Sequence, residues 1–363
     1  MKKIAYITGD SSLTGAPLHI LQLAKNFKDK YKILVITSPG KLVELCQEEK
    51  IAVKEIPMRG PLDWRAVDKI GVELKKFAPD IVHTHGIRAG WLGRLASRNL
   101  KCKKIYTEHL WTSTFHLKNR AYEQFQLRGL RFMDRYTDAT IAVSKTVADF
   151  LIKSRGFDKS KIHIIPNGIS ARFIESKPIQ KPSGVPLLLG SIGALNNVKN
   201  HQSAIRAFAQ AVRENETLNV HFQIVGEGPA RKRLENLIKR EKMEDRIHLV
   251  GRVEDVCERL SHYALFISLS LSESFGMAVA EAMGVGLPVI TSDIPALKNL
   301  VGKAGVLVPP RDIKKATEEI ASLLKDQKRQ ENLGRIAKQR IKNSFSEKLM
   351  IDRTERLYKK LLN

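Results

Sequence analysis

Short apolar runs alternate with longer amphipathic segments along the first half of the chain. The runs are typical of buried parallel strands, and the amphipathic segments are typical of helices that cover a sheet. The predicted strands are 3–8, 32–37, 53–56, 81–84, 104–107, 139–143 and 162–165. The predicted helices are 17–27, 41–49, 64–77, 89–98, 115–136 and 145–155.

A second series of the same kind follows a segment with three prolines and no apolar periodicity, residues 175–186, which we interpret as a linker. Its predicted strands are 187–192, 221–225, 247–249, 264–271, 288–291 and 305–308. Its predicted helices are 202–214, 229–241, a short one near 255, one from about 277, and 313–326, 327–345 and 348–361.

Repeated strand–helix order predicts an α/β fold with two doubly wound, Rossmann-like domains that face each other across a cleft. At 363 residues the chain is too long for one ordinary core. We expect a first domain at 1–174, the linker at 175–186 and a second domain at 187–345. The final helix, about 346–363, is expected to pack back on the first domain.

Two glutamates eight residues apart, Glu273 and Glu281, bracket the predicted start of a helix at Met277. The free N–H groups at such a helix end suit a diphosphate, whereas carboxylates repel phosphate and accept hydrogen bonds from a vicinal diol. This arrangement suits a sugar nucleotide. A single glutamate on a helix is usually solvated, but Glu281 interrupts an almost wholly apolar helix, where an unpaired charge is costly.

The composition argues against a membrane-spanning protein, a disulfide-rich protein and a zinc protein. No run approaches 18 apolar residues, and the N-terminus leads directly into a strand, so we expect a cytoplasmic location. Cys46, Cys102 and Cys257 show neither disulfide nor zinc-site spacing. His83 and His85 alternate along a strand end and face one side, but no third metal ligand is evident.

The net charge of +24 indicates attraction to a polyanion, and the excess leans towards the N-terminal half. Segment 115–136 interleaves arginines with aromatic and aliphatic residues. Two interpretations stay open: a basic amphipathic helix that lies on an anionic membrane, and an ordinary surface helix whose apolar stripe packs on the sheet. Nucleic-acid binding is suggested only by charge, and the chain lacks aromatics interleaved on a sheet face or any recognised reading motif.

A series of short motifs occurs in order along nearly the whole chain. They are Thr14–His19, Pro79–Arg94, Tyr106–His109, Ala142–Ser144, Ile165–Ile169, Ile192–Gly193, Lys199–Asn200, Val225–Pro229, Gly251–Val253, Glu273–Glu281 and Gly286–Ser292. Taken together, the chain resembles the retaining GT-B glycosyltransferases of the family 4 type, also called glycosyl transferases group 1. The resemblance implies a nucleotide-sugar-binding second domain and an acceptor-side first domain.

The resemblance also implies roles for particular residues. Glu281 would hold the donor ribose, Glu273 the transferred sugar, and Lys199 the diphosphate as it leaves. His109 would contact the sugar near the reacting carbon; a packed or capping histidine is the alternative. The catalytic residues implied are His109, Lys199 and Glu273. The other donor-binding positions implied are Gly15, Gly193, Gly226, Arg252, Val253, Ser274, Phe275, Gly276 and Met277.

One position departs from the family pattern. Many relatives carry an arginine directly after the glycine that matches Gly193, whereas this chain has Ala194. Either another basic residue substitutes, or the grip on the diphosphate is weaker by roughly a few kcal/mol.

The resemblance implies transfer with retention at the anomeric carbon, by front-face displacement, without a resident cofactor and with a UDP-sugar as the expected co-substrate. No Asp-x-Asp occurs, so we expect metal independence. The expected acceptor is a lipid-linked or cell-envelope glycan, met at the inner face of the cell membrane. A nucleotide-sugar epimerase or other non-transferase enzyme of the same fold is the alternative; its catalytic set is not evident.

Overall fold

The computed structural model describes residues 1–11, 15–113, 116, 119–179 and 184–363, and it divides the chain into two compact units. Unit 1 comprises Met1–Gly168 and Glu347–Asn363, and unit 2 comprises Ile169–Ser346. The chain therefore crosses between the units directly after Gly168 and again directly after Ser346.

The first crossing lies before the proline-rich segment 175–186. A five-residue helix, α7 (Ala171–Glu175), follows the crossing and packs in unit 2 against α11 (Met277–Val285). The described residues of 175–186 thus belong to unit 2. A helix this short has no periodicity that the sequence reveals, whereas the prolines beyond it are conspicuous.

Unit 1 contains a sheet of seven parallel strands in the order β3-β2-β1-β4-β5-β6-β7. The strands are β1 Lys3–Thr8, β2 Lys32–Thr37, β3 Ala52–Glu55, β4 Ile81–His85, β5 Lys103–Glu108, β6 Ala139–Ala142 and β7 Ile162–Ile164. Because successive side chains point to opposite faces, β1 sends Ile4 and Tyr6 into one core and Ala5 and Ile7 into the other.

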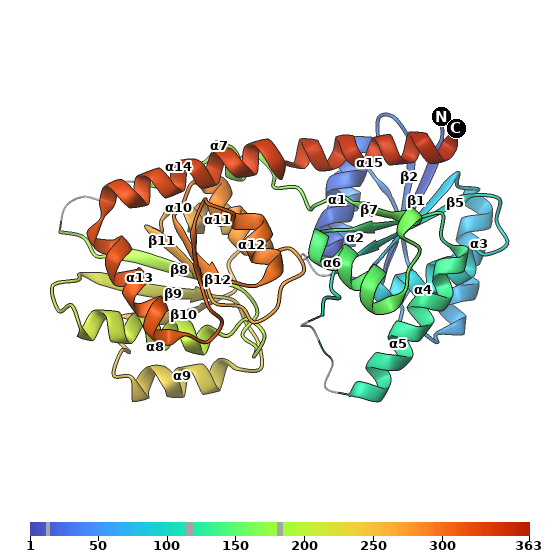
Figure 1. The fold of residues 1–363 in the computed structure, drawn as a ribbon. Helices are drawn as coiled ribbons and strands as arrows, with labels where there is room; N and C mark the ends of the chain where they lie inside the picture. Colours follow the sequence, from blue (N-terminus) through green and yellow to red (C-terminus); the bar gives the residue numbers. More distant parts are fainter. Residues whose placement is uncertain (12–14, 114–115, 117–118, 180–183) are drawn as a thin grey trace. The chain divides into compact units, whose positions relative to one another are not determined.

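Helices cover both faces of the unit 1 sheet (Figure 1). The first core takes its apolar side chains from α1, α2 and α15, and the second from α3 and α4. The C-terminal helix α15 thus packs on unit 1. The helical segments are α1 Ala16–Phe27, α2 Lys41–Glu48, α3 Trp64–Phe77, α4 Gly86–Ala96, α5 Arg120–Met133, η1 Asp134–Tyr136, α6 Lys145–Asp149, η2 Phe150–Ser154, η3 Lys159–Lys161 and α15 Glu347–Leu362.

Unit 2 contains six parallel strands in the order β10-β9-β8-β11-β12-β13. They are β8 Leu187–Ile192, β9 Val220–Val225, β10 Ile247–Gly251, β11 Leu265–Ser268, β12 Val289–Ser292 and β13 Val306–Val308. Strand β11 is shorter than the apolar run 264–271 that predicts it. Leu269 and Ser270 are buried without being part of the strand, because burial does not require a strand partner.

The unit 2 helices also cover both faces of their sheet (Figure 1). They are α7, α8 His201–Arg213, α9 Arg231–Arg240, α10 Val256–Ser261, α11, α12 Pro295–Val301, α13 Ile313–Lys325 and α14 Gln327–Ser344. The sequence pattern missed α12, which has only seven residues and begins at a proline. The expected fold class is confirmed: each unit is a Rossmann-like parallel α/β sheet.

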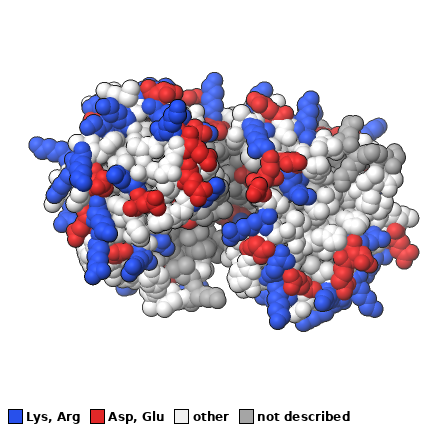
Figure 2. Space-filling model, turned by 180° about the vertical axis from the view of Figure 1, so that it is seen from behind, with Lys and Arg blue, Asp and Glu red and all other residues white. Residues whose placement is uncertain are grey.

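Among the described residues, no helix combines the length and the apolar character needed to cross a bilayer. Figure 2 shows one face of the molecule, on which Lys and Arg side chains are interspersed with Asp and Glu over both units. On that face the large positive charge is spread out, which differs from the basic stripe of a nucleic-acid-binding module.

Candidate functional site

Three loops in unit 2 meet where β8, β9 and β10 end. The Gly226 N–H donates to the Gly251 carbonyl at 2.7 Å, and the Gly193 N–H donates to the Val225 carbonyl at 3.0 Å. Gly226 has φ 142°, and a Cβ there would lie 2.0 Å from the Gly193 carbonyl oxygen, so only glycine fits. The loops therefore approach each other backbone to backbone, at the edge where open parallel sheets bind ligands.

The residues after these glycines differ in charge. Ala194 follows Gly193 and brings no cation, as the sequence showed. Arg252 follows Gly251, is exposed, and has no ion pair among the residues that the structure describes. Arg231 also reaches this cluster, but Glu227 neutralises it at 2.9 Å. Arg252 is thus an unneutralised cation in the loop cluster that lacks the family's usual arginine.

Lys199 and Glu273 form an ion pair although 74 positions separate them. The Lys199 Nζ lies 2.6 Å from Glu273 Oε1, and the side chains are only 27% and 12% exposed. The Lys199 backbone N–H donates to Asn196 Oδ1 at 3.0 Å, and the Asn200 side chain donates to the Leu269 carbonyl at 3.0 Å. These bonds hold the start of α8 beside the loop that carries Glu273.

The helix that Glu273 precedes begins at Met277, as the pattern predicted. Gly276 caps it with φ 99°, and a Cβ there would lie 2.5 Å from the Leu297 side chain. Phe275 is buried and its ring lies 5.7 Å from that of Phe345. The backbone from 274 to 277 is therefore tightly placed, and the first turn of α11 presents N–H groups with the positive end of the helix dipole.

Glu281 lies one turn into α11, between the buried residues Ala280 and Ala282. Burial raises the pKa of its carboxyl group to about 7. No hydrogen bond or ion pair to it occurs within the described part of the chain. A carboxylate that is largely removed from water and has no partner favours its protonated form, and hydroxyl donors from a ligand would favour the charged form instead.

Four histidines gather in unit 1, on α1, on β4 and directly after β5. The His83 and His85 rings lie 4.1 Å apart, and His109 lies 5.3 Å from His85 and 5.1 Å from His19. The His85 Nδ1 and the His109 Nε2 are 3.1 Å apart, within hydrogen-bonding distance. Burial lowers the pKa of all four imidazoles, so they are neutral near pH 7.

His83 uses both ring nitrogens for hydrogen bonds, to the Tyr358 hydroxyl at 2.5 Å and to Thr107 Oγ1 at 2.6 Å. The metal-ligand interpretation of His83 and His85 thus finds no support: in the parts of the chain that are described, no group of three His, Cys, Asp or Glu side chains could hold a metal ion. His83 instead joins β4 and β5 to the C-terminal helix α15.

Three buried ring nitrogens in this group have no hydrogen-bond partner in the described structure: His19 Nε2, His85 Nε2 and His109 Nδ1. Asn167 holds the other nitrogen of His19 at 2.9 Å. Buried polar groups are normally paired, so this is where a hydroxyl-bearing ligand would be best accommodated in unit 1. The motifs contained His19, His85 and Asn167, but their spacing alone assigned them no role.

Glu108 fixes the turn that carries His109. Its buried carboxyl group accepts from the Tyr106 hydroxyl at 2.6 Å and from the backbone N–H groups of Leu110 and Trp111 at 2.8 and 3.2 Å. The buried Arg94 guanidinium lies 4.4 Å from the centre of the Tyr106 ring. Burial raises the pKa of Glu108 and lowers that of Arg94 to about 10. Sequence reasoning gave neither charged residue a role.

Gly15 caps α1 with φ 56°, a conformation that favours glycine. A Cβ at this position would meet nothing within 4 Å. The conformation rather than crowding therefore accounts for the glycine. Thr14, the first residue of the same motif, lies outside the described residues.

Two family models match successive parts of the chain. Glycosyltransferase Family 4 matches residues 13–173, and Glycosyl transferases group 1 matches residues 173–340. A crystal structure of Anabaena Alr3699/HepE in complex with UDP and glucose superposes with a TM-score of 0.87 at 21% identity, covering 99% of this chain and 100% of that chain. That likeness shows the fold.

Two relatives are more similar in sequence. The chain is 29% identical to N-acetyl-alpha-D-glucosaminyl L-malate synthase of Bacillus anthracis over 173 residues, which is 47% of this chain and 45% of that protein. It is 27% identical to the Escherichia coli UDP-Gal:alpha-D-GlcNAc-diphosphoundecaprenol alpha-1,3-galactosyltransferase over 311 residues, 82% of this chain and 79% of that protein. The chain belongs to the family 4 glycosyltransferases, which have the GT-B fold.

Proposed function

We propose that this protein is a retaining hexosyltransferase that moves a sugar from a nucleotide diphosphate sugar to a lipid-linked or cell-envelope glycan. The observation that carries the proposal is the arrangement around the start of α11, where Glu273 and Glu281 flank the helix end and Lys199 lies 2.6 Å from Glu273. Carboxylates suit sugar and ribose hydroxyls, whereas the lysine and the helix end suit the diphosphate.

The relatives support the choice of donor and acceptor. The E. coli relative is named for UDP-galactose as donor and a diphosphoundecaprenol-linked sugar as acceptor, and the Anabaena structure contains UDP and glucose. We therefore propose a UDP-sugar as the co-substrate and a glycan carried on a lipid diphosphate as the acceptor.

The chemistry of the proposed transfer is the departure of a diphosphate from the anomeric carbon. Lys199 neutralises the negative charge that grows on the leaving oxygen, and the first N–H groups of α11 add the positive end of the helix dipole. His109, held by Glu108 and His85, offers a neutral imidazole to the sugar. A front-face displacement, in which the departing phosphate takes the acceptor proton, accounts for retention without a protein nucleophile.

A donor screen followed by a transfer assay tests this function. We expect one of the UDP-, GDP- and ADP-sugars to raise the unfolding temperature most, because a ligand at about 100 times its Kd stabilises the native state by about 2.7 kcal/mol. With that donor and a lipid diphosphate sugar as acceptor, the product should keep the donor's anomeric configuration in a proton NMR spectrum, and EDTA should leave the rate unchanged.

Several results would contradict the proposal in different ways. An epimerised sugar without a glycoside would favour the epimerase alternative. Inversion at the anomeric carbon would refute retention, and loss of activity in EDTA would refute metal independence. If no nucleotide sugar stabilises the protein, the donor class itself is wrong.

The pH dependence of nucleotide binding should report Glu281. If its carboxylate accepts the ribose hydroxyls, binding favours the ionised form and lowers a pKa that is about 7 in the free protein. UDP affinity should therefore fall by up to about tenfold per pH unit as the pH drops below about 7. Calorimetric titrations of UDP into wild-type protein and into Glu281→Gln measure the two Kd values at each pH. The ionisation of UDP affects both proteins equally, so the ratio of the two Kd values reports the ionisation of Glu281 alone. A constant ratio between about pH 5.5 and about pH 8 would rule the contact out.

We also propose that α5 holds unit 1 on the anionic inner face of the cell membrane. This helix packs with one stripe, which includes the buried Leu127 and Leu130, as the ordinary-helix interpretation expected. It nevertheless leaves Tyr122, Phe125 and Phe132 exposed at 43%, 41% and 46%. Residues 114–115 and 117–118 of the predicted helix lie outside the described residues.

Vesicle binding tests the membrane proposal. Exposed arginines accompany the aromatic side chains of α5, so binding to phosphatidylglycerol vesicles should be strong at low salt and weak at high salt. Phe125→Ser/Phe132→Ser should weaken the binding by roughly tenfold, since two partly inserted rings are lost. Leu62→Ser/Val72→Ser removes two apolar side chains of unit 1 that are at least as exposed, and it should leave vesicle binding unchanged. An equal loss of vesicle binding in both double variants would refute the proposed role of α5.

A further inference from the structure

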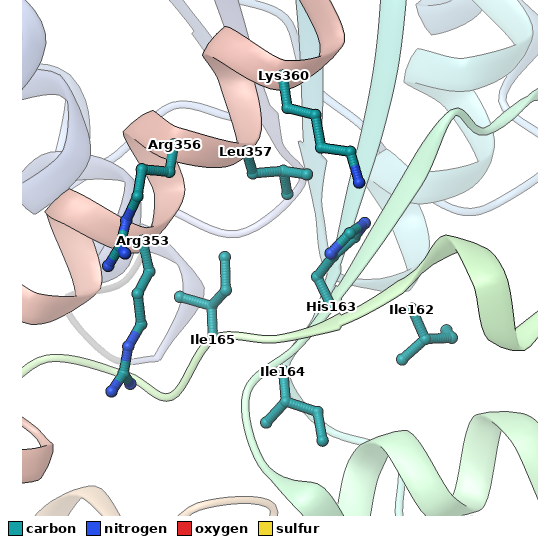
Figure 3. Close-up of a pocket in the computed structure, with 8 residues that line it drawn as sticks. All are labelled: Ile162, His163, Ile164, Ile165, Arg353, Arg356, Leu357 and Lys360. Atoms are coloured by element: carbon teal, nitrogen blue, oxygen red, sulfur yellow. The ribbon is translucent and has the colours of Figure 1, made fainter.

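A cavity in unit 1 lies between the edge strand β7 and the C-terminal helix α15 (Figure 3). Its volume is about 660 Å³, within the range of roughly 300–1,000 Å³ typical of small-molecule sites. The residues that line it are Ile162, His163, Ile164, Ile165, Arg353, Arg356, Leu357 and Lys360. We call this cavity the β7–α15 groove.

The charge of the groove is entirely positive. Arg353, Arg356 and Lys360 are three, four and seven positions apart on α15, which places them on one side of the helix. In Figure 3 the two arginines lie together on one side of Leu357, and Lys360 reaches towards His163 on the other. No acidic residue lines the groove, and within the described ranges none of the three cations is in an ion pair.

Two acids of α15, Asp352 and Glu355, lie next to the groove cations in the sequence. Asp352 forms no ion pair with them in the described structure; its backbone carbonyl accepts from the Arg356 Nε–H at 3.3 Å. Glu355 pairs with Lys30 at 3.2 Å and with Lys359 at 3.1 Å, away from the groove. Neither acid is thus paired with the three groove cations among the described residues, and the cations repel one another. Burial, and then the charge of Lys360, lowers the pKa of His163. An anion bound in the groove would reduce this repulsion and favour the charged form of His163.

The rest of the lining is apolar. Ile164 is 47% exposed at the groove, and Leu357 and Ile165 form its inner wall. Arginine presents a planar fork of donors that matches phosphate oxygens, and lysine adds a point charge. A phosphate with an apolar group attached would satisfy both halves of this lining.

We propose that the β7–α15 groove binds a soluble organic phosphate, as a ligand site distinct from the nucleotide-sugar site in unit 2. The phosphate lies against Arg353, Arg356 and Lys360, and the apolar part lies on Ile164 and Leu357. A lipid headgroup is the other source of the same chemistry, but the exposed aromatic side chains that suit a membrane are on α5. In Figure 1, α5 and α15 lie at opposite ends of unit 1.

NMR titration of His163 tests the site directly and does not depend on the transfer reaction. His163→Gln assigns its ring signal among the ten histidines. Inorganic phosphate and phenyl phosphate, each compared with chloride at equal ionic strength, should raise the pKa of His163 because a bound anion stabilises the imidazolium. Phenyl phosphate should half-saturate at a roughly tenfold lower concentration, since its ring covers apolar surface.

Variants that lose the same charge at different places distinguish binding in the groove from the general attraction of phosphate to a positively charged protein. Arg353→Gln/Arg356→Gln should weaken phenyl phosphate binding at least about tenfold. Lys32→Gln/Lys348→Gln removes the same charge from unit 1 outside the groove and should leave the binding unchanged. An unchanged pKa of His163 in phosphate, or equal losses in both double variants, would overturn the site. Displacement of phenyl phosphate by phosphatidylglycerol vesicles would show that the groove binds a lipid headgroup and would refute a soluble phosphate as its ligand.

Discussion

Replacing Lys199 with alanine is expected to lower kcat by a factor on the order of 10²–10³, with a smaller effect on donor affinity. A fixed cation at the leaving diphosphate acts mainly where charge develops in the transition state, and losing one such group costs about 3–4 kcal/mol. Because Ala194 supplies no second cation at the family's usual position, the loss is not shared with an arginine there. Steady-state kinetics with the donor identified by the screen measures kcat and KM separately.

The ion pair with Glu273 requires controls. Lys199→Ala leaves the Glu273 carboxylate, only 12% exposed, without its partner, so part of the effect could come from a displaced glutamate. Lys199→Ala/Glu273→Gln removes that charge, and because Glu273 is itself proposed to bind the sugar, this variant is compared with Glu273→Gln alone. It should be slower than Glu273→Gln if the cation is what matters. Lys298→Ala breaks an exposed pair with Asp293 in the same unit and should keep full activity. A wild-type kcat in Lys199→Ala would remove Lys199 from the mechanism.

Replacing the buried Arg94 with methionine is expected to destabilise unit 1 by about 3–5 kcal/mol. Arg94 is fully buried, donates to the Gly90 carbonyl and to Thr137 Oγ1 at 2.8 Å, and stacks on Tyr106. Methionine fills much of the volume but leaves the buried Glu108 without the nearby positive charge. Removing one member of a buried set of charges costs more than the set contributes, because Glu108 keeps its hydrogen bonds but loses a nearby opposite charge.

Urea unfolding followed by tryptophan fluorescence measures this change. All three tryptophans of the chain are in unit 1, so the signal reports that unit. Arg98→Met is the matched control: Arg98 lies just beyond the same helix, is exposed, and should change the free energy of unfolding by no more than about 0.5 kcal/mol. Arg94→Met/Glu108→Gln should recover part of the loss. A cost below about 1 kcal/mol in Arg94→Met would show that the buried charges are not coupled.

The helix bounds show which parts of the secondary structure the local sequence pattern can predict. Helix α3 occupies the predicted residues Trp64–Phe77, because its apolar residues recur at helical spacing and Asp63 caps it. The predicted helix 145–155 is instead α6, Lys145–Asp149, followed by a wider turn at Phe150–Ser154. Short helices such as α7 and α12 escaped prediction, since one or two turns contain too few apolar positions to show a period.

Some features of the candidate site could likewise be predicted from local sequence, and others could not. The placement of Glu281 one turn into an apolar helix follows from the sequence alone, and so does the loop position of Glu273, because both depend on residues within a few positions of each other. The sequence also located His109 at the end of a strand. It could not show that Lys199 pairs with Glu273, nor that Glu108 and Arg94 are buried beneath the His109 turn, since contacts of that range depend on which strands become neighbours.

By itself, the sequence determined the alternation of strands and helices, the α/β class and the two carboxylates at a helix start, because side-chain periods of 2 and 3.6 residues are local properties. Only the tertiary structure decided that four histidines meet in unit 1 and that Tyr358, 275 positions away, holds one of them. It also brought β7 and α15 together into a groove without an acid. The order of strands in a sheet and the return of the last helix are set by burial of whole elements, which no local window of sequence contains.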